Sequence, residues 1–367
     1  MKEKLLKLME EFKVRDLSYA IVKGNEIIAS ENLGECSKKE EPKFRIASIS
    51  KPILCTALMT FWEEGRFNLE DDINKYLDFP VRNPKYEDKP ITILSLMTHT
   101  SGLKGDGDDY FYDLLDNKEF IYMKDLICKE GRFFKDIIWS DNEPGKHFDY
   151  SNLGYTLLGG ILEKISGMDM DKCCIERVFK PLGMDASFDV LNLKHLSEVC
   201  PACRYDEEKG IHYNTKDDYS IEKPVAVSGT SELGNCLRIS PAGGVRTSLV
   251  DLSKFMRMHM HGGEFNGVRV LKKETVDLMH RAHWTGVSEG GFYKAKGLGF
   301  QITEEIYKGL KLVGHAGEAY GIRCGMYFNE KQDFGIIILE NGGIDKKVNK
   351  NEFTEVEKGI YNIILSR

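Results

Sequence analysis

The sequence lacks the long apolar and strongly basic stretches that mark two large classes of protein. No apolar run approaches the length of a membrane span, and the longest, around residues 335–339, is typical of a buried strand. No basic run occurs, and the formal net charge is −7. Because nucleic acids and anionic membranes attract basic surfaces, neither is expected as a partner.

Several common catalytic and nucleotide-binding motifs are also missing. The chain has no Gly-x-Ser-x-Gly elbow, no His-Glu-x-x-His zinc helix, no Walker phosphate loop and no dinucleotide-binding glycine pattern that opens a helix. His195, Cys200, Cys203 and His212 could supply four zinc ligands, but their spacing lacks the second close pair of a known zinc module. We therefore expect neither a metal nor another cofactor.

The chain carries no pattern typical of export. Residues 1–12 are charged throughout and lack an uninterrupted apolar core, so they predict an amphipathic helix rather than a signal peptide. The nine cysteines, an odd number, fit reduced intracellular thiols better than a disulfide framework. Together these features predict a cytoplasmic protein.

The length and the hydrophobic patterning predict an α+β protein with two lobes. A chain of 367 residues with ordinary globular composition can bury a large core. Strand-like alternation occurs at both ends of the chain, with a hairpin signal at Gly24-Asn25 in the first stretch. The predicted strands cover residues 17–28, 298–305, 306–315, 321–328 and 334–341. Helical patterns fill the middle, including one helix expected to run from Ser240-Pro241 to Gly262-Gly263.

Strands at both ends with helices between them imply a discontinuous domain. We predict an antiparallel sheet of about five strands, with the N- and C-terminal helices on one face. Residues 1–66 and 225–367 would form this sheet domain, and residues 67–224 would form a mainly helical insertion domain. Residues 104–120 are acidic and aromatic and are expected to form a surface loop that runs into a helix.

Ser48 and Lys51 have the spacing of a nucleophile and its base. Residues three apart on a helix share a face, so the Ser48 hydroxyl and the Lys51 amine can meet. Pro52 is tolerated only in the first turn of a helix, which places the helix start close to Ser48. Unpaired N–H groups at that start favour negative charge, and a lysine in a dry site can lose its proton. One short segment could therefore supply nucleophile, base and oxyanion donor.

Three motifs stand in order along the chain: Ser48-x-x-Lys51, Tyr150-Ser151-Asn152 and His315-Ala316-Gly317. With accessory segments at 96–103, 181–184 and 242–252, they make the chain resemble the serine β-lactamase and penicillin-binding-protein-like family. The resemblance is to the branch that contains class C β-lactamases, D-aminopeptidases and family VIII carboxylesterases. It implies the β-lactamase/transpeptidase-like fold and an active site between the two domains.

The resemblance also implies roles for the matching residues. Ser48 would attack an ester or amide carbonyl and form an acyl-enzyme, while Lys51 and Tyr150 would handle the proton, and which of them is the base stays open. Asn152 would donate to a carbonyl on the acyl side of the substrate. The backbone N–H groups of Ser48 and Glu318 would bind the oxyanion.

Two residues depart from the β-lactamase pattern. His315 replaces a lysine that binds a substrate carboxylate, and the His-x-Gly form is typical of peptidases and esterases. Glu318 places a carboxylate beside Gly317, which would lie against the substrate backbone. Unless Arg323 neutralises it, Glu318 should discourage anionic substrates and favour an amine.

The predicted function is cleavage of a small ester, amide or short peptide by a serine hydrolase. Carboxylesterase activity ranks first, a D-amino-acid peptidase or DD-carboxypeptidase-like amidase second, and β-lactamase third. An inactive binding protein that keeps the pocket is the alternative from another class. His99 invites a serine–histidine triad interpretation, but its Thr-His-Thr-Ser-Gly setting is more typical of a structural histidine. The oligomeric state stays open.

Overall fold

The structure is a computed structural model that describes residues 1–104, 110, 114, 121–224, 234, 240–307, 309–344 and 353–366. An eight-stranded antiparallel sheet forms its centre. In spatial order the strands are β2 (Glu26–Gly34), β1 (Asp16–Lys23), β14 (Phe334–Asn341), β13 (Ile322–Asn329), β12 (Leu312–Ala319), β11 (Gln301–Thr303), β10 (Ala295–Lys296) and β9 (Trp284–Thr285). The N-terminal hairpin thus pairs with the last strand of the chain, as Leu17 opposite Glu340 shows.

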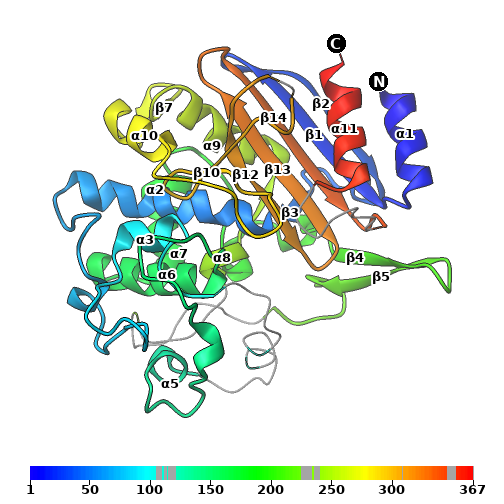
Figure 1. The fold of residues 1–367 in the computed structure, drawn as a ribbon. Helices are drawn as coiled ribbons and strands as arrows, with labels where there is room; N and C mark the ends of the chain where they lie inside the picture. The colour runs from blue at the N-terminus through cyan, green and yellow to red at the C-terminus, as the bar shows by residue number, and fades with distance from the viewer. Residues whose placement is uncertain are drawn as a thin grey trace.

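Both faces of the sheet are covered by helices. α1 (Lys2–Glu11) and α11 (Glu355–Leu365) lie side by side on one face, where Figure 1 draws them in blue and red. α9 (Leu249–Met260) packs against β1, β13 and β14. Side chains alternate between two cores along each strand, so Ile336 and Ile338 join the α1 and α11 core and Ile337 joins the other. This confirms the predicted α+β class and the placement of the terminal helices.

The helical part of the chain lies beside one end of the sheet (Figure 1). Its long helices are α2 (Ser50–Glu63) and α6 (Asn152–Ser166), and the shorter ones are α3 (Ile93–Met97), α5 (Met123–Ile127), α7 (Met170–Cys174) and α8 (Ser240–Gly243). Gly159 allows α6 to approach α8 closely, because a Cβ there would lie 2.5 Å from Pro241 Cγ. The assignment of residues 67–224 to a separate domain stays a prediction, and residue 225 lies outside the described residues.

Several predicted element boundaries were wrong. The sheet has eight strands rather than about five. β9 and β10 span two residues each, too few for alternation to be visible in the sequence, whereas β11 lies within the strand predicted at 298–305. The strand predicted at 306–315 is β12, which lies at Leu312–Ala319 and so places His315 inside the strand. The single helix predicted to follow Ser240 is divided into α8, the strand β6 (Arg246–Ser248) and the helix α9 (Leu249–Met260).

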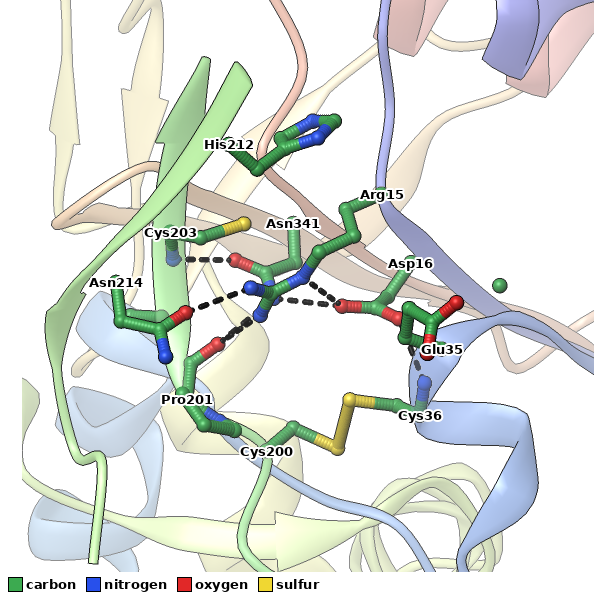
Figure 2. A network of polar contacts seen from close by, with 12 residues as sticks. Arg15, Asp16, Glu35, Cys36, Cys200, Pro201, Cys203, His212, Asn214 and Asn341 are labelled. Atoms are coloured by element: carbon green, nitrogen blue, oxygen red, sulfur yellow. Dashed lines mark hydrogen bonds and ion pairs between the residues drawn. A yellow bond between two sulfur atoms is a disulfide. The ribbon is translucent and has the colours of Figure 1, made fainter. Parts of the chain in front are cut away.

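Cys36 and Cys200 form a disulfide, which contradicts the expectation of reduced thiols for these two residues. Their Cα atoms are 6.0 Å apart although 164 residues separate them in sequence (Figure 2). Six other cysteines in the described ranges are free: Cys55, Cys128, Cys173, Cys174, Cys203 and Cys324. Since Cys200 is bonded to Cys36, it cannot also serve as the thiolate of the considered zinc site.

A polar network fixes the segment beyond the disulfide against the sheet (Figure 2). Asp16 accepts hydrogen bonds from the Cys36 N–H at 2.7 Å and from the Asn341 side chain at 2.9 Å. Asn341 in turn accepts from the Cys203 N–H at 2.9 Å. This network holds β4 (Ala202–Asp206), which pairs with β5 (Ile211–Lys216), beside the end of β14.

Among the helices that the structure describes, none is both long enough and apolar enough to cross a bilayer. Cytoplasmic location remains a prediction.

Candidate active site

Ser48 lies in a tight turn directly before α2. The turn is the 3-10 helix η2 (Ala47–Ile49), and α2 begins at the next residue, with Pro52 in its first turn as predicted. The backbone of Ala47 has a φ of 44°, a left-handed value that non-glycine residues adopt mostly in constrained sites. The Ile46 N–H donates to the Val245 carbonyl at 2.9 Å, which anchors the turn to the segment after α8.

The Lys51 side chain is fully buried and its amine contacts three oxygens. Lys51 Nζ lies 2.9 Å from Ser48 Oγ, 2.6 Å from Asn152 Oδ1 and 2.8 Å from the carbonyl oxygen of Ala242. The last two atoms only accept, so two N–H bonds of the amine point at them. The third direction faces Ser48 Oγ. In the neutral amine this direction holds the lone pair, which can accept the serine proton.

Tyr150 reaches the same serine from the other side. Its hydroxyl lies 2.7 Å from Ser48 Oγ, and Lys51 Nζ lies 4.8 Å from the centre of its ring. Asn152 is the first residue of α6, and the N-cap of this helix is Ser151, whose hydroxyl accepts from the Gly154 N–H at 3.1 Å. The Asn152 side chain is thereby left to contact Lys51.

Gly317 packs against the turn that carries Ser48. A Cβ at this position would lie 2.6 Å from the Ile46 carbonyl oxygen and 3.1 Å from Ser48 N. Atoms of the protein itself therefore exclude a side chain at Gly317, and its contact with the substrate backbone stays a prediction. The binding of a substrate oxyanion by the backbone N–H groups of Ser48 and Glu318 stays a prediction.

Glu318 forms an ion pair with its cross-strand partner. Arg323 Nη2 donates to Glu318 Oε1 at 2.9 Å, while the Glu318 side chain remains half-exposed and that of Arg323 is nearly buried. Arg323 thus neutralises the charge of Glu318. The prediction that Glu318 discourages anionic substrates held only for a Glu318 that is not neutralised, so it no longer applies.

His315 lies behind the site and contacts a lysine that the sequence analysis missed. The imidazole is fully buried, with Nδ1 2.5 Å from the Ala316 carbonyl oxygen and Nε2 2.9 Å from Lys296 Nζ. Burial, and then the charges of Lys296 and Lys51, lower the pKa of His315 well below its usual value. One feature of the sequence points to Lys296: it directly precedes the apolar stretch at 297–300, where buried residues are expected.

His99 has the structural role that its sequence setting suggested. Its Nδ1 accepts a hydrogen bond from the Ser151 N–H at 3.0 Å, and its ring stacks on Tyr150 with centroids 4.3 Å apart. Burial is the main cause that lowers the pKa of His99 well below the usual range. His99 thus supports the start of α6 and the Tyr150 ring. It forms no contact with Ser48 Oγ.

Ser48 opens into a cavity of about 1020 Å³. Tyr150, Asn152, Gly317 and Glu318 also line it, whereas Lys51 and His315 lie behind its surface. Aromatic and charged side chains form its outer wall: Arg204, Tyr205, Glu207, Phe292, Tyr293, Tyr320 and Phe353. The loop predicted at 104–120 lies almost wholly outside the described residues.

The match to known families agrees with this geometry. The family model described as Beta-lactamase matches residues 2–357. The chain belongs to the beta-lactamase family. Family membership, and the serine hydrolase chemistry of its members, confirm the predicted resemblance.

Curated relatives of this beta-lactamase family member are distant in sequence. Protein flp of Staphylococcus aureus (strain N315) is 24% identical over 337 residues, which cover 88% of this chain and 59% of the relative. Penicillin-binding protein 4 of Amycolatopsis lactamdurans is 25% identical over 323 residues, which cover 82% of this chain and 72% of the relative. The chain thus spans about three-fifths of the length of the Staphylococcus aureus protein.

Solved structures share the fold over the whole chain. The octameric penicillin-binding protein homologue from Pyrococcus abyssi has a TM-score of 0.72 at 22% identity, and the match covers 100% of this chain and 77% of that one. The D-amino acid amidase from Ochrobactrum anthropi SV3, complexed with L-phenylalanine amide, has a TM-score of 0.72 at 20% identity, with coverages of 100% and 97%. At these identities the likeness shows the fold alone.

Proposed function

We propose that this chain hydrolyses a small carboxylic ester or amide through an acyl-enzyme on Ser48. One observation carries the proposal: Ser48 Oγ lies between Lys51 Nζ at 2.9 Å and Tyr150 Oη at 2.7 Å, at the wall of a cavity. A serine that contacts two groups able to move a proton, and that can meet a substrate, is arranged for nucleophilic attack.

In the first half of the reaction, Ser48 Oγ bonds to the carbonyl carbon and its proton passes to Lys51 or Tyr150. Negative charge then develops on the carbonyl oxygen, where the N–H groups of Ser48 and Glu318 would stabilise it. One such donor contributes about 3 kcal/mol in comparable sites. The bond to the leaving alcohol or amine breaks as Tyr150 returns the proton to it.

In the second half, water replaces the leaving group. The same pair of residues takes a proton from the water, the new C–O bond forms, and the bond from the acyl carbon to Ser48 Oγ breaks with return of the proton to the serine. Asn152 would hold the acyl side of the substrate, because its amide lies beside Lys51 and lines the cavity. His315 would act from behind the site, because both of its ring nitrogens already have partners.

Carboxylesterase activity is the primary proposal for the reaction class. It requires only the Ser48, Lys51 and Tyr150 arrangement, and ester alcohols leave more readily than amines. A D-amino-acid amidase is the second candidate. The fold of the Ochrobactrum anthropi D-amino acid amidase over the whole chain favours it. β-Lactamase activity ranks third.

The proposal is tested by covalent labelling followed by a substrate panel. A fluorophosphonate probe should label the wild-type protein at Ser48 and leave Ser48→Ala unlabelled. Matched p-nitrophenyl esters and D-alanyl or D-phenylalanyl amides then rank the two candidate activities by kcat/KM. Absence of labelling in the wild-type protein, or equal labelling of Ser48→Ala, would favour the alternative of an inactive binding protein.

A further inference from the structure

Lys296 is a fully buried lysine directly behind the proposed catalytic residues. It belongs to β10, and its Nζ lies 2.9 Å from Nε2 of His315 and 5.2 Å from the centre of the Tyr293 ring. Across the part of the chain that the structure describes, no carboxylate forms an ion pair with Lys296. Lysines are almost never fully buried without such a partner, so this one requires an explanation.

Lys43 shows what a structural buried lysine looks like in the same protein. It is equally buried, yet its Nζ lies 3.2 Å from an Asp185 carboxylate oxygen and 3.6 Å from one of Glu41. Lys51, the other lysine that is fully buried among the described residues, faces Ser48. Lys296 therefore differs from the structural lysine, because no carboxylate in the described ranges forms an ion pair with it.

The contacts of His315 fix which of its nitrogens holds the proton. Nδ1 faces the Ala316 carbonyl oxygen, which can only accept, so the ring proton lies on Nδ1. The pKa of His315 is lowered well below its usual range, which leaves Nε2 without a proton. Lys296 must then be the donor in its 2.9 Å contact with Nε2.

Lys296 shares one buried site with other titratable groups. These groups are Lys51 and Cys55 from α2, His99 from the turn after α3, His315 from β12 and Tyr293 from the segment before β10. Burial is the larger cause, and the charge of Lys51 the second, that lower the pKa of Lys296 well below its usual value. The effect is mutual, because two amines in one buried site hold fewer protons together than they would apart.

We propose that Lys296 is a positioning residue for the reaction: its amine donates to Nε2 of His315 and holds the imidazole behind Tyr150 with the ring proton on Nδ1. This inference rests on the proposed function. It also explains why His315 is placed behind Tyr150 with both nitrogens engaged.

The test compares two substitutions of Lys296 by the rate of fluorophosphonate labelling. Lys296→Met removes the donor to His315 at similar volume, whereas Lys296→Gln keeps an N–H donor. We expect Lys296→Met to lower the second-order labelling rate at least about tenfold and Lys296→Gln to retain more of the wild-type rate. Lys43→Met serves as the control, with the wild-type labelling rate and a lower Tm.

A folded Lys296→Met variant with the wild-type labelling rate would overturn the proposal. Thermal unfolding separates this role from a merely structural one, because replacing an unpaired buried lysine by methionine should raise Tm while the labelling rate falls. If the variant does not fold, the ¹⁵N spectrum of His315 in the wild-type protein provides the test. A proton on Nδ1 supports the proposal, and a proton on Nε2 contradicts it.

The same spectrum separates failure of this inference from failure of the proposed function. If the wild-type protein is not labelled by the fluorophosphonate, the proposed hydrolase function fails. The hydrogen bond between Lys296 and His315 is then judged on the ¹⁵N spectrum alone.

Discussion

Two buried polar clusters of the molecule differ in how their charges are satisfied. Asp217 receives hydrogen bonds from two guanidinium groups, with Arg45 Nε at 2.8 Å and Arg246 Nη2 at 2.6 Å. Lys51 and Lys296 instead contact hydroxyl, carbonyl and imidazole groups. A buried cation with a matching carboxylate is held in one protonation state, whereas a buried lysine without one can exchange its proton.

The pKa values follow the same division. Burial opposes ionisation of Asp217, but the charges of Arg45 and Arg246 outweigh it and hold the pKa of that carboxyl far below its usual value. For Lys296 no such partner offsets burial, and its pKa is lowered. The Asp217 cluster therefore stabilises the fold, whereas no ion pair in the described residues stabilises the charged form of Lys296.

The contrast between the two clusters predicts that the largest loss of activity follows substitution of Ser48. Ser48→Ala should lower hydrolysis of any substrate found by at least about 10³-fold, because the nucleophile of the proposed acyl-enzyme is lost. The melting temperature should stay close to that of the wild-type protein, since the hydroxyl is small and partly exposed. Residual turnover above one-tenth of the wild-type rate would contradict the nucleophile assignment. The measurement is kcat/KM alongside thermal unfolding.

Asp217→Asn should lower the stability of the protein, whereas Ser48→Ala should lower its activity. Removing the carboxylate leaves two buried guanidinium groups without their partner, so we expect a loss of about 3–5 kcal/mol in the free energy of unfolding. Urea denaturation provides the measurement. Asp206→Asn is the matched control, because Asp206 pairs with Lys209 in solvent and should contribute little.

The Asp217 cluster also predicts a pH dependence of stability. The carboxyl has a lower pKa in the folded protein than its usual 3.8, so the unfolded chain binds more protons as the pH falls. The stabilisation is present above that value and is lost on acidification between about pH 5 and pH 2. Wild type should therefore lose more stability than Asp217→Asn over this range. Parallel urea midpoints for the two proteins would contradict this account.

Gly317→Ala tests how closely β12 and the serine turn depend on each other. The added Cβ would lie 2.6 Å from the Ile46 carbonyl oxygen, so the turn that carries Ser48 must shift. A displacement of this kind can lower kcat/KM about 100-fold. Gly154→Ala is the control, because a Cβ there makes only ordinary contacts, the nearest with Leu96 at 3.5 Å. Similar kcat/KM values for the two variants would show that the contact is unimportant.

Glu318→Gln should have the smallest effect. Because Arg323 already neutralises Glu318, the substitution frees a guanidinium group at the cavity and should raise kcat/KM for carboxylate-bearing substrates about two- to fivefold over neutral analogues. Glu3→Gln, on the exposed side of α1, provides the control. An equal change for both substrate types would show that Glu318 does not select by charge.

The sequence by itself determined the α+β class, the terminal helices on one face and the Ser48–Lys51 spacing. These features follow from hydrophobic periodicity, helix-start signals and the order of motifs, and all three can be read from one amino-acid sequence. It also placed His315 on a strand. Short strands such as β10 escaped, because two residues are too few for a period to be visible.

Only the tertiary structure decided which side chains meet. Arg323 neutralises Glu318 because the two residues are opposite each other in the β12–β13 register, and Cys36 meets Cys200 across 164 residues of chain. Lys296 belongs to no motif, and its proposed role follows entirely from its burial beside His315 and Lys51. Burial and the pairing of charges depend on distances between distant segments, and these distances exist only after the chain has folded.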